Sequence, residues 1–206
     1  KPVSNELKHG FSNQARFRRA RKYAAKRINT VPIPPYIIMD IETTGLDPLQ
    51  DDIIELAALK IEPDNYTEFH RYISNKRELP KEIVQLTGIT EQILAQKGQD
   101  ISETLDDFMN FLGELPIVGY NVHFDIEFTN NSLRRINRET MKNRKIDLMG
   151  LVKREKMFLK SYRLEDVLLA YEIDEPISHQ ALEDARLTYI LSTKVNGFAD
   201  QLNRKR

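Results

Sequence analysis

Two acidic residues two positions apart are the first candidates for chemistry in this chain. Asp40 and Glu42 follow the apolar run Tyr36–Met39 in the stretch YIIMDIETTGL. Successive side chains of a strand point to opposite faces, so both acids project from one face, about 6.6 Å apart along the strand. At an effective dielectric constant near 20, their charges repel by roughly 2.5 kcal/mol. A cation between them would relieve that cost, because hard divalent ions prefer carboxylate oxygens. The alternative is a solvated strand end with no ligand.

A further acid, Asp125, stands where a short apolar strand is expected to pass into a helix, in the stretch GYNVHFD (residues 119–125). Ligands bind at the carboxyl ends of strands in open α/β sheets. Asn121 could fix the turn through side-chain hydrogen bonds, and Phe124 could anchor it in the core. The alternative is an acid in the first turn of a helix, where the helix dipole favours it without any ligand.

The third candidate stretch, SHQALEDARLTYI (residues 178–190), contains His179 and Asp184. In a helix with 3.6 residues per turn, positions five apart lie about 140° apart around the axis, so these two would not share a face. They can meet if His179 lies in the loop before the helix and Asp184 lies inside it. Ala181, Ala185 and Thr188 are small and would let this helix approach a sheet closely. Alternatively, His179 neighbours a helix N-cap and has no chemical role.

The elements that must position these residues are strands first, and then strands alternating with helices. This order predicts an α/β fold, in which a mixed sheet has helices on both faces and the strand at residues 36–42, apolar on both sides, is central. The predicted strands span residues 36–42, 52–64, 66–75 and 116–121, and residues 63–65 supply the turn between the second and the third. Residues 144–151 are expected to be a strand that passes into a helix. The predicted helices span residues 80–88, 100–115, 124–139, 162–173 and 180–195, and Thr90 or the nearby acids can begin one more.

The composition is that of a protein with an ordinary hydrophobic core. Among the 206 residues 40% are apolar and 30% are charged. No apolar run approaches the roughly 18 residues that a membrane span requires. The absence of cysteine excludes disulfides, thiolate catalysis and cysteine-bound zinc. We therefore expect no membrane association and a cytoplasmic location, while the oligomeric state is left open.

Charge is unevenly distributed along the chain. Residues 1–27 hold nine Lys or Arg and one acid, although the whole sequence has a net charge of zero, so the remainder is acidic. We divide the chain into a basic N-terminal arm (1–30) that could be helical, a Pro-rich linker (31–35), a main domain (36–197) and a basic C-terminal tail (198–206).

The ordered set DIETTG, NVHFD and HQALEDA resembles the three motifs of the DEDDh, or DnaQ-like, 3′→5′ exonucleases. That family includes the epsilon proofreading subunit of bacterial DNA polymerase III. The spacing of the motifs is also similar, and VQLTGITEQIL resembles the segment between the first two. The resemblance covers about residues 35–195 and leaves the basic arm outside. It implies a ribonuclease H-like fold, with the exonuclease domain at residues 36–197.

By this resemblance, four acids bind two divalent cations, Mg²⁺ or Mn²⁺, and a histidine takes part in catalysis. The acids are Asp40, Glu42, Asp125 and Asp184, and the histidine is His179. The resemblance also implies a substrate-binding set, in which a turn lets a nucleotide approach and the residues before the second-motif acid lie nearby. That set is Thr43, Thr44, Gly45, Leu46, Asn121 and Phe124.

Three functions are compatible with these residues. The first is a DNA 3′→5′ exonuclease that acts on single-stranded or frayed ends in proofreading or repair, either alone or with a DNA polymerase. The second is the same chemistry on RNA, which the motifs do not distinguish because discrimination rests on contacts to the 2′-OH. The third is a nucleic-acid-binding or polymerase-associated module without catalysis, which would not need all five catalytic residues.

The basic arm has a composition suited to nucleic acid. Two aromatic residues, Phe17 and Tyr23, stand among several cations, and such a mixture can bind phosphates and stack on bases. The alternative is a solvated arm, or a helix packed on the acidic body. The candidate contacts are Arg16, Arg18, Arg19, Arg21 and Lys22.

Overall fold

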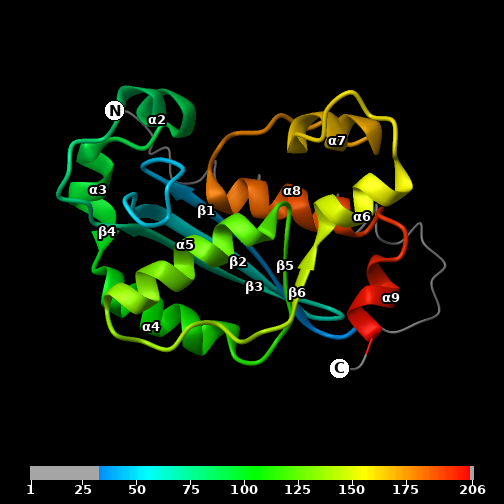
Figure 1. Ribbon diagram of the computed structural model, residues 1–206, viewed down its shortest axis with the longest axis horizontal. Coiled ribbons are helices and arrows are strands. Elements are labelled where there is room, and N and C mark those ends of the chain that lie inside the picture. The colour runs from blue at the N-terminus through cyan, green and yellow to red at the C-terminus, as the bar shows by residue number, and fades with distance from the viewer. Residues whose placement is uncertain (1–32, 205–206) are drawn as a thin grey trace, which may run out of the picture.

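A computed structural model describes residues 33–204, and its centre is a six-stranded sheet (Figure 1). The strand order is β4-β3-β2-β1-β5-β6, so β1 is an inner strand, as predicted. The sheet is mixed, because β1 is antiparallel to β2 but parallel to β5. The strands are β1 (Tyr36–Thr43), β2 (Ile53–Ile61), β3 (Tyr66–Ile73), β4 (Gly98–Gln99), β5 (Ile117–Gly119) and β6 (Lys145–Asp147).

The apolar residues of β1 contribute to the core on both faces of the sheet. Ile37 and Met39 pack on one face, while Ile38 packs on the other, and all three are fully buried. Alternation along the strand explains why one apolar run supplies two layers of core. The same alternation puts Asp40 and Glu42 on the face of Ile38, toward the carboxyl end of the strand.

Helices cover both faces of the sheet (Figure 1). Helices α4 and α5 pack on the face of Ile37, and helices α6, α7, α8 and α9 pack on the opposite face. Helices α2 and α3 enclose a smaller cluster around Ile54. The helices are α2 (Lys81–Thr87), α3 (Glu91–Lys97), α4 (Ile101–Leu112), α5 (Val122–Arg135), α6 (Leu148–Glu155), α7 (Leu164–Ala170), α8 (Ala181–Ser192) and α9 (Phe198–Asn203).

Local signals set several of the helix ends. Helix α2 ends at Gly88, whose φ of 72° lies in the left-handed region that glycine adopts readily. Helix α3 begins after Thr90, whose side chain accepts a hydrogen bond from the N–H of Ile93. Asp100 caps α4 in the same way. The predictions that a helix ends at Gly88 and that another can begin at Thr90 are confirmed.

The packed body continues into the segment predicted as a C-terminal tail. Residues 198–203 form α9, and both Phe198 and Leu202 are buried in the core on the α8 face. The ring of Phe198 meets that of Tyr36 edge-on, with ring centroids 5.3 Å apart. A helix of this length has too few apolar positions to show a helical period in the sequence, so only its packing identifies it.

The structure describes only a little of the chain that precedes β1. The basic arm (1–30), including its five candidate contact residues, lies outside the described residues. Of the Pro-rich linker, residues 33–35 precede β1 without regular secondary structure. No helix between residues 33 and 204 is long and apolar enough to cross a membrane.

We predict that Phe198→Ala lowers the free energy of unfolding by about 3–5 kcal/mol, because it removes a buried ring and leaves a cavity. Phe158→Ala is the matched control: that side chain is 93% exposed, and its loss should change the free energy by at most about 0.5 kcal/mol. Urea denaturation followed by circular dichroism measures both. Equal midpoints for the two variants would mean that α9 does not stabilise the domain.

Candidate active site

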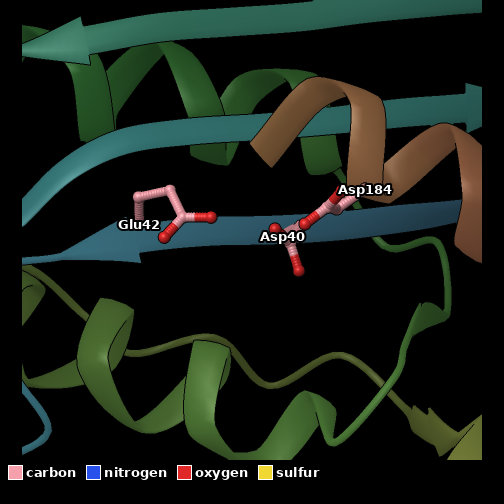
Figure 2. Close-up of side chains that lie close together, drawn as sticks. All are labelled: Asp40, Glu42 and Asp184. Carbon is pink, nitrogen blue, oxygen red and sulfur yellow. The ribbon is translucent and has the colours of Figure 1, made fainter. Parts of the chain in front are cut away.

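Three carboxylates converge at the carboxyl end of β1. Asp40 and Glu42 project from the strand, and Asp184 reaches toward Asp40 from the first turn of α8 (Figure 2). One oxygen of each carboxylate lies within 4.8 Å of the other two. Helix α8 can approach the sheet closely because Ala181 and Ala185 are small and fully buried there. The first and third sequence motifs therefore meet in space.

Asp125 reaches the same strand from α5. It is buried in the first turn of that helix, and its Oδ1 accepts a hydrogen bond of 3.1 Å from the backbone N–H of Ile41. Toward the start of β1, the N–H of Ile37 donates to the carbonyl of Pro116, on the side of β5. Strand β5 pairs with β1 only as far as Ile38, so the Ile41 N–H lies beyond its end. The carboxylate of Asp125 therefore accepts from a backbone N–H of β1 at a position that β5 does not reach.

Burial is the largest cause that raises the pKa of each of these acids, and the charges of neighbouring acids add to it. The pKa of Asp40 is well above its usual range, and the charge of Asp125 is the next cause after burial, followed by that of Glu42. The pKa is raised to about 9 for Glu42, to about 8 for Asp125 and to about 6 for Asp184. A set of repelling carboxylate oxygens fits a hard divalent cation, which would neutralise the charge.

His179 lies in the loop before α8, as predicted. Helix α8 begins at Ala181, and His179 has a φ of 50°, in the left-handed region where histidine is more frequent than most residues. The loop contacts the acidic group through its backbone, because the N–H of Ser178 donates to Oδ1 of Asp184 at 3.4 Å. Among the described residues, the ligand atoms that gather within 4.8 Å are those of Asp40, Glu42 and Asp184, and the group includes neither His179 nor Asp125.

The turn after β1 is held together by its own side chains. Thr43 donates its hydroxyl to the carbonyl of Gly45 at 2.6 Å, and Thr44 donates its hydroxyl to Oδ1 of Asp51 at 3.2 Å. A Cβ at Gly45 would lie 2.3 Å from Oδ2 of Asp51, so a side chain at this position would displace the Asp51 carboxylate from its hydrogen bonds with the Thr44 hydroxyl and the N–H of Asp47. Leu46 follows and is 84% exposed. The turn is therefore compact and presents an apolar side chain to solvent beside the acids.

Arg135 holds the far side of this turn. Its guanidinium donates to the carbonyls of Pro48 and Asp51, at 3.0 and 3.2 Å, and to the carboxylate of Asp52 at 3.0 Å. Arg135 is the last residue of α5, and Asp125 lies in the first turn of the same helix. Helix α5 thus braces both the acidic group and the turn beside it.

Asn121 fixes the turn before α5 through its backbone, and the prediction that its side chain does so is wrong. Its side chain makes no capping hydrogen bond to α5. Instead, its φ of 59° lies in the left-handed region that asparagine tolerates, and its N–H donates to Oδ1 of Asp147 at 2.9 Å. Phe124 is half-buried, and its ring lies 4.7 Å from that of Phe128 between centroids, an arrangement that anchors this turn.

Glu55 is an acid near the site that sequence reasoning missed. It lies opposite Glu42 in the pairing of β1 with β2 and is almost fully buried. One of its oxygens accepts a hydrogen bond from the N–H of Ala181 at 3.0 Å, and the other lies 2.7 Å from Nε2 of His70. The signal was a single acid inside the apolar strand IIELAALKI, because acids are rarely buried without partners.

A family model described as Exonuclease (RNase_T) matches residues 37–191. The chain belongs to the DnaQ-like exonuclease family. It is 35% identical to a DNA polymerase III PolC-type protein of Thermotoga maritima over 154 residues, which cover 74% of this chain. It is 32% identical to the PolC-type protein of Bacillus subtilis over 162 residues, or 78% of this chain. The match spans only 11% of the length of each of these relatives.

Solved structures of other proteins show the same fold. Exonuclease I superposes with a TM-score of 0.71 at 24% identity, over 82% of this chain and 42% of the other. E. coli exonuclease I in complex with a dA16 oligonucleotide gives a TM-score of 0.70 at 23% identity, with the same coverage. The predicted ribonuclease H-like fold is confirmed.

The raised pKa values predict how pH affects the stability of the cation-free protein. A carboxyl group with a raised pKa binds more protons in the folded state than in the unfolded chain, so stability falls as pH rises above the ordinary value near 4. The fall should continue through the raised values, about 6 for Asp184, about 8 for Asp125 and about 9 for Glu42. Urea unfolding in chelator, between about pH 5 and about pH 9, measures it.

Glu42→Gln is the variant that tests the cause. It removes a carboxyl group whose pKa is raised by burial and by neighbouring charges, so the stability of the variant should fall less over the same range of pH and should increase less when Mg²⁺ is added. Identical pH profiles for the variant and the original chain would contradict the raised pKa of Glu42 on which this prediction rests.

Proposed function

We propose that this exonuclease hydrolyses the 3′-terminal phosphodiester of single-stranded or frayed DNA and releases nucleoside 5′-monophosphates. The observation that carries the proposal is the approach of Asp40, Glu42 and Asp184 within 4.8 Å of one another, with Asp125 hydrogen-bonded to the same strand. The complex of E. coli exonuclease I with a dA16 oligonucleotide supports single-stranded DNA as the substrate.

The four acids would hold two divalent cations, Mg²⁺ or Mn²⁺. Their oxygens suit hard ions, and the absence of cysteine leaves the chain no thiolate for a softer site. When bound, the ions would supply Lewis acidity, which lowers the pKa of water and stabilises charge on a leaving oxygen. A zinc-bound form of the complex of E. coli exonuclease I with single-stranded DNA supports metal binding by this fold.

His179 would accept the proton of the attacking water at an imidazole nitrogen, because histidine exchanges protons near neutral pH. The water oxygen forms a bond to the terminal phosphorus. The bond from that phosphorus to the 3′ oxygen of the preceding nucleotide breaks, and that oxygen takes a proton. This role is supported by the position of His179 in the loop before α8, whose backbone donates a hydrogen bond to Asp184.

The terminal nucleoside would bind beside the turn after β1. Leu46 is exposed there on a turn that Asp51 and Arg135 hold in place, so an apolar contact with a base would need little reorganisation. Thr43, Thr44 and Gly45 would offer backbone groups, and Phe124 would line the opposite side. A role in proofreading or repair is supported by the PolC-type relatives, which are named as DNA polymerases.

We predict that Asp40→Asn abolishes turnover while the protein remains folded, because the acidic group loses a member with little change in volume. Asp107→Asn is the matched control: Asp107 is exposed on α4, on the opposite face of the sheet, and its loss should leave the rate unchanged. DNA oligonucleotides labelled at either end, incubated with Mg²⁺, Mn²⁺ or chelator, measure the rate and polarity of degradation. Normal activity of the Asp40 variant would refute the assignment.

His179→Ala should slow hydrolysis by about 10²- to 10⁴-fold while Mg²⁺ still stabilises the fold, since general base catalysis contributes about that much. An unchanged rate would remove His179 from the mechanism.

The same assay on RNA oligonucleotides separates the remaining alternatives. Degradation of RNA alone would identify an exoribonuclease, and binding without degradation of either polymer would identify a module without catalysis.

A further inference from the structure

A short segment that runs from the last turn of α6 to the start of α7 carries a charge opposite to that of the protein around it. Residues 153–163, the basic segment, contain five Lys or Arg and one acid. Residues 33–204 as a whole contain 20 Lys or Arg and 30 Asp or Glu. An acidic protein repels nucleic acid, so a concentrated positive segment is where such a polymer can be held. The cations are Lys153, Arg154, Lys156, Lys160 and Arg163.

Three of these cations are available to a ligand. Lys153, Arg154 and Lys160 are exposed, and within residues 33–204 none of the three forms an ion pair with an acid, while the Nζ of Lys153 lies 5.5 Å from the centroid of the Tyr162 ring. Arg163 differs, because it forms ion pairs with two acids at the start of α7. Glu155, the acid within the segment, accepts hydrogen bonds from Asn196 at 2.7 and 2.8 Å.

An aromatic ring stands in the middle of the basic segment. Phe158 is 93% exposed, more than any other large apolar side chain between residues 33 and 204, and Met157 beside it is 65% exposed. A fully exposed ring gains nothing from the core of its own domain. Exposed aromatic rings interleaved with cations bind single-stranded nucleic acids, because bases stack on the rings while the cations contact phosphates.

The basic segment is tied to the candidate active site. The hydroxyl of Tyr162 donates to the carbonyl of Lys156 at 2.7 Å and closes the loop. The hydroxyl of Tyr120 donates to the carbonyl of Tyr162. Tyr120 follows β5 and immediately precedes Asn121, from which α5 and Asp125 begin. The position of the segment is therefore set by the same turn that positions Asp125.

We propose that the basic segment binds the single strand on the 5′ side of the scissile bond, with Phe158 stacking on a base and Lys153, Arg154 and Lys160 contacting phosphates. The inference rests on the proposed function, because it takes the strand whose 3′ end lies at the acids to be the ligand. Charge complementarity and the exposed ring favour nucleic acid over a protein partner, which carries no regular row of phosphates.

The experiment compares a long single-stranded DNA oligonucleotide with a dinucleotide, in which only one nucleoside lies on the 5′ side of the scissile bond. Phe158→Ala should raise KM for the long substrate about five- to hundredfold, as expected for the loss of one stacked base. Combined Lys153→Gln, Arg154→Gln and Lys160→Gln should reduce the slope of log binding constant against log salt by about 2, as expected for three phosphate contacts. The kcat/KM for the dinucleotide serves as the internal reference.

The matched control is a double variant, Lys76→Gln and Lys97→Gln, which replaces two exposed lysines near the opposite edge of the sheet. Lys76 follows β3 and Lys97 directly precedes β4, whereas β6 at the opposite edge leads into α6. This control should leave both the KM and the salt slope unchanged. Fluorescence anisotropy of a labelled oligonucleotide gives an independent measure of binding that does not need turnover.

The outcomes separate the two proposals. An original chain that degrades neither substrate refutes the proposed function, while anisotropy still tests the segment. If the original chain is active but the Phe158→Ala variant and the triple variant bind the long oligonucleotide as tightly as it does, this inference is overturned. The basic segment would then be a candidate surface for a protein partner. Equal losses on the dinucleotide and the long substrate also overturn it, because the segment would then act on the site itself.

Discussion

The repulsion between acids gathered at the carboxyl end of β1 is the constraint on which the rest of the structure depends. One carboxylate oxygen from each of Asp40, Glu42 and Asp184 lies within 4.8 Å of the other two. Burial and the charges of neighbouring acids raise the pKa of each of these groups. Such a group would separate if its supports could move. β1 cannot move easily, because its preceding residues are buried in tightly packed core on both faces. The apolar run before the acids thus has a mechanical role.

Two helices are fixed to the sheet by hydrogen bonds that also satisfy buried backbone groups. Asp125 accepts from Ile41 where β5 has ended, and Glu55 accepts from Ala181, where α8 begins. A buried N–H without a partner costs about 1–3 kcal/mol, so both carboxylates stabilise the fold while they locate an acid of the site. The start of α8 is particularly important, because it sets the positions of both Asp184 and the loop of His179.

Acidic and basic residues of the domain lie in different places and would bind different ligands. The buried acids attract cations, but the negative charge of the described chain opposes a polyanionic substrate. A cluster of cations away from the acids overcomes this conflict without neutralising the site, and residues 153–163 have that character. The link from Tyr120 to Tyr162 gives the cluster a fixed relation to α5.

The sequence by itself determined the order and kind of most elements, the inner position of β1 and the shared face of Asp40 and Glu42, because these follow from local periodicity and alternation along a strand. It also placed His179 before a helix and Asp184 within it. Only the tertiary structure decided the rest. It brought α8 to β1, made Asp125 a substitute for a missing strand partner, buried Glu55 beside them and packed α9 into the core. These features depend on where strands end and which backbone groups are left unpaired, and such facts arise from contacts between residues far apart in the sequence.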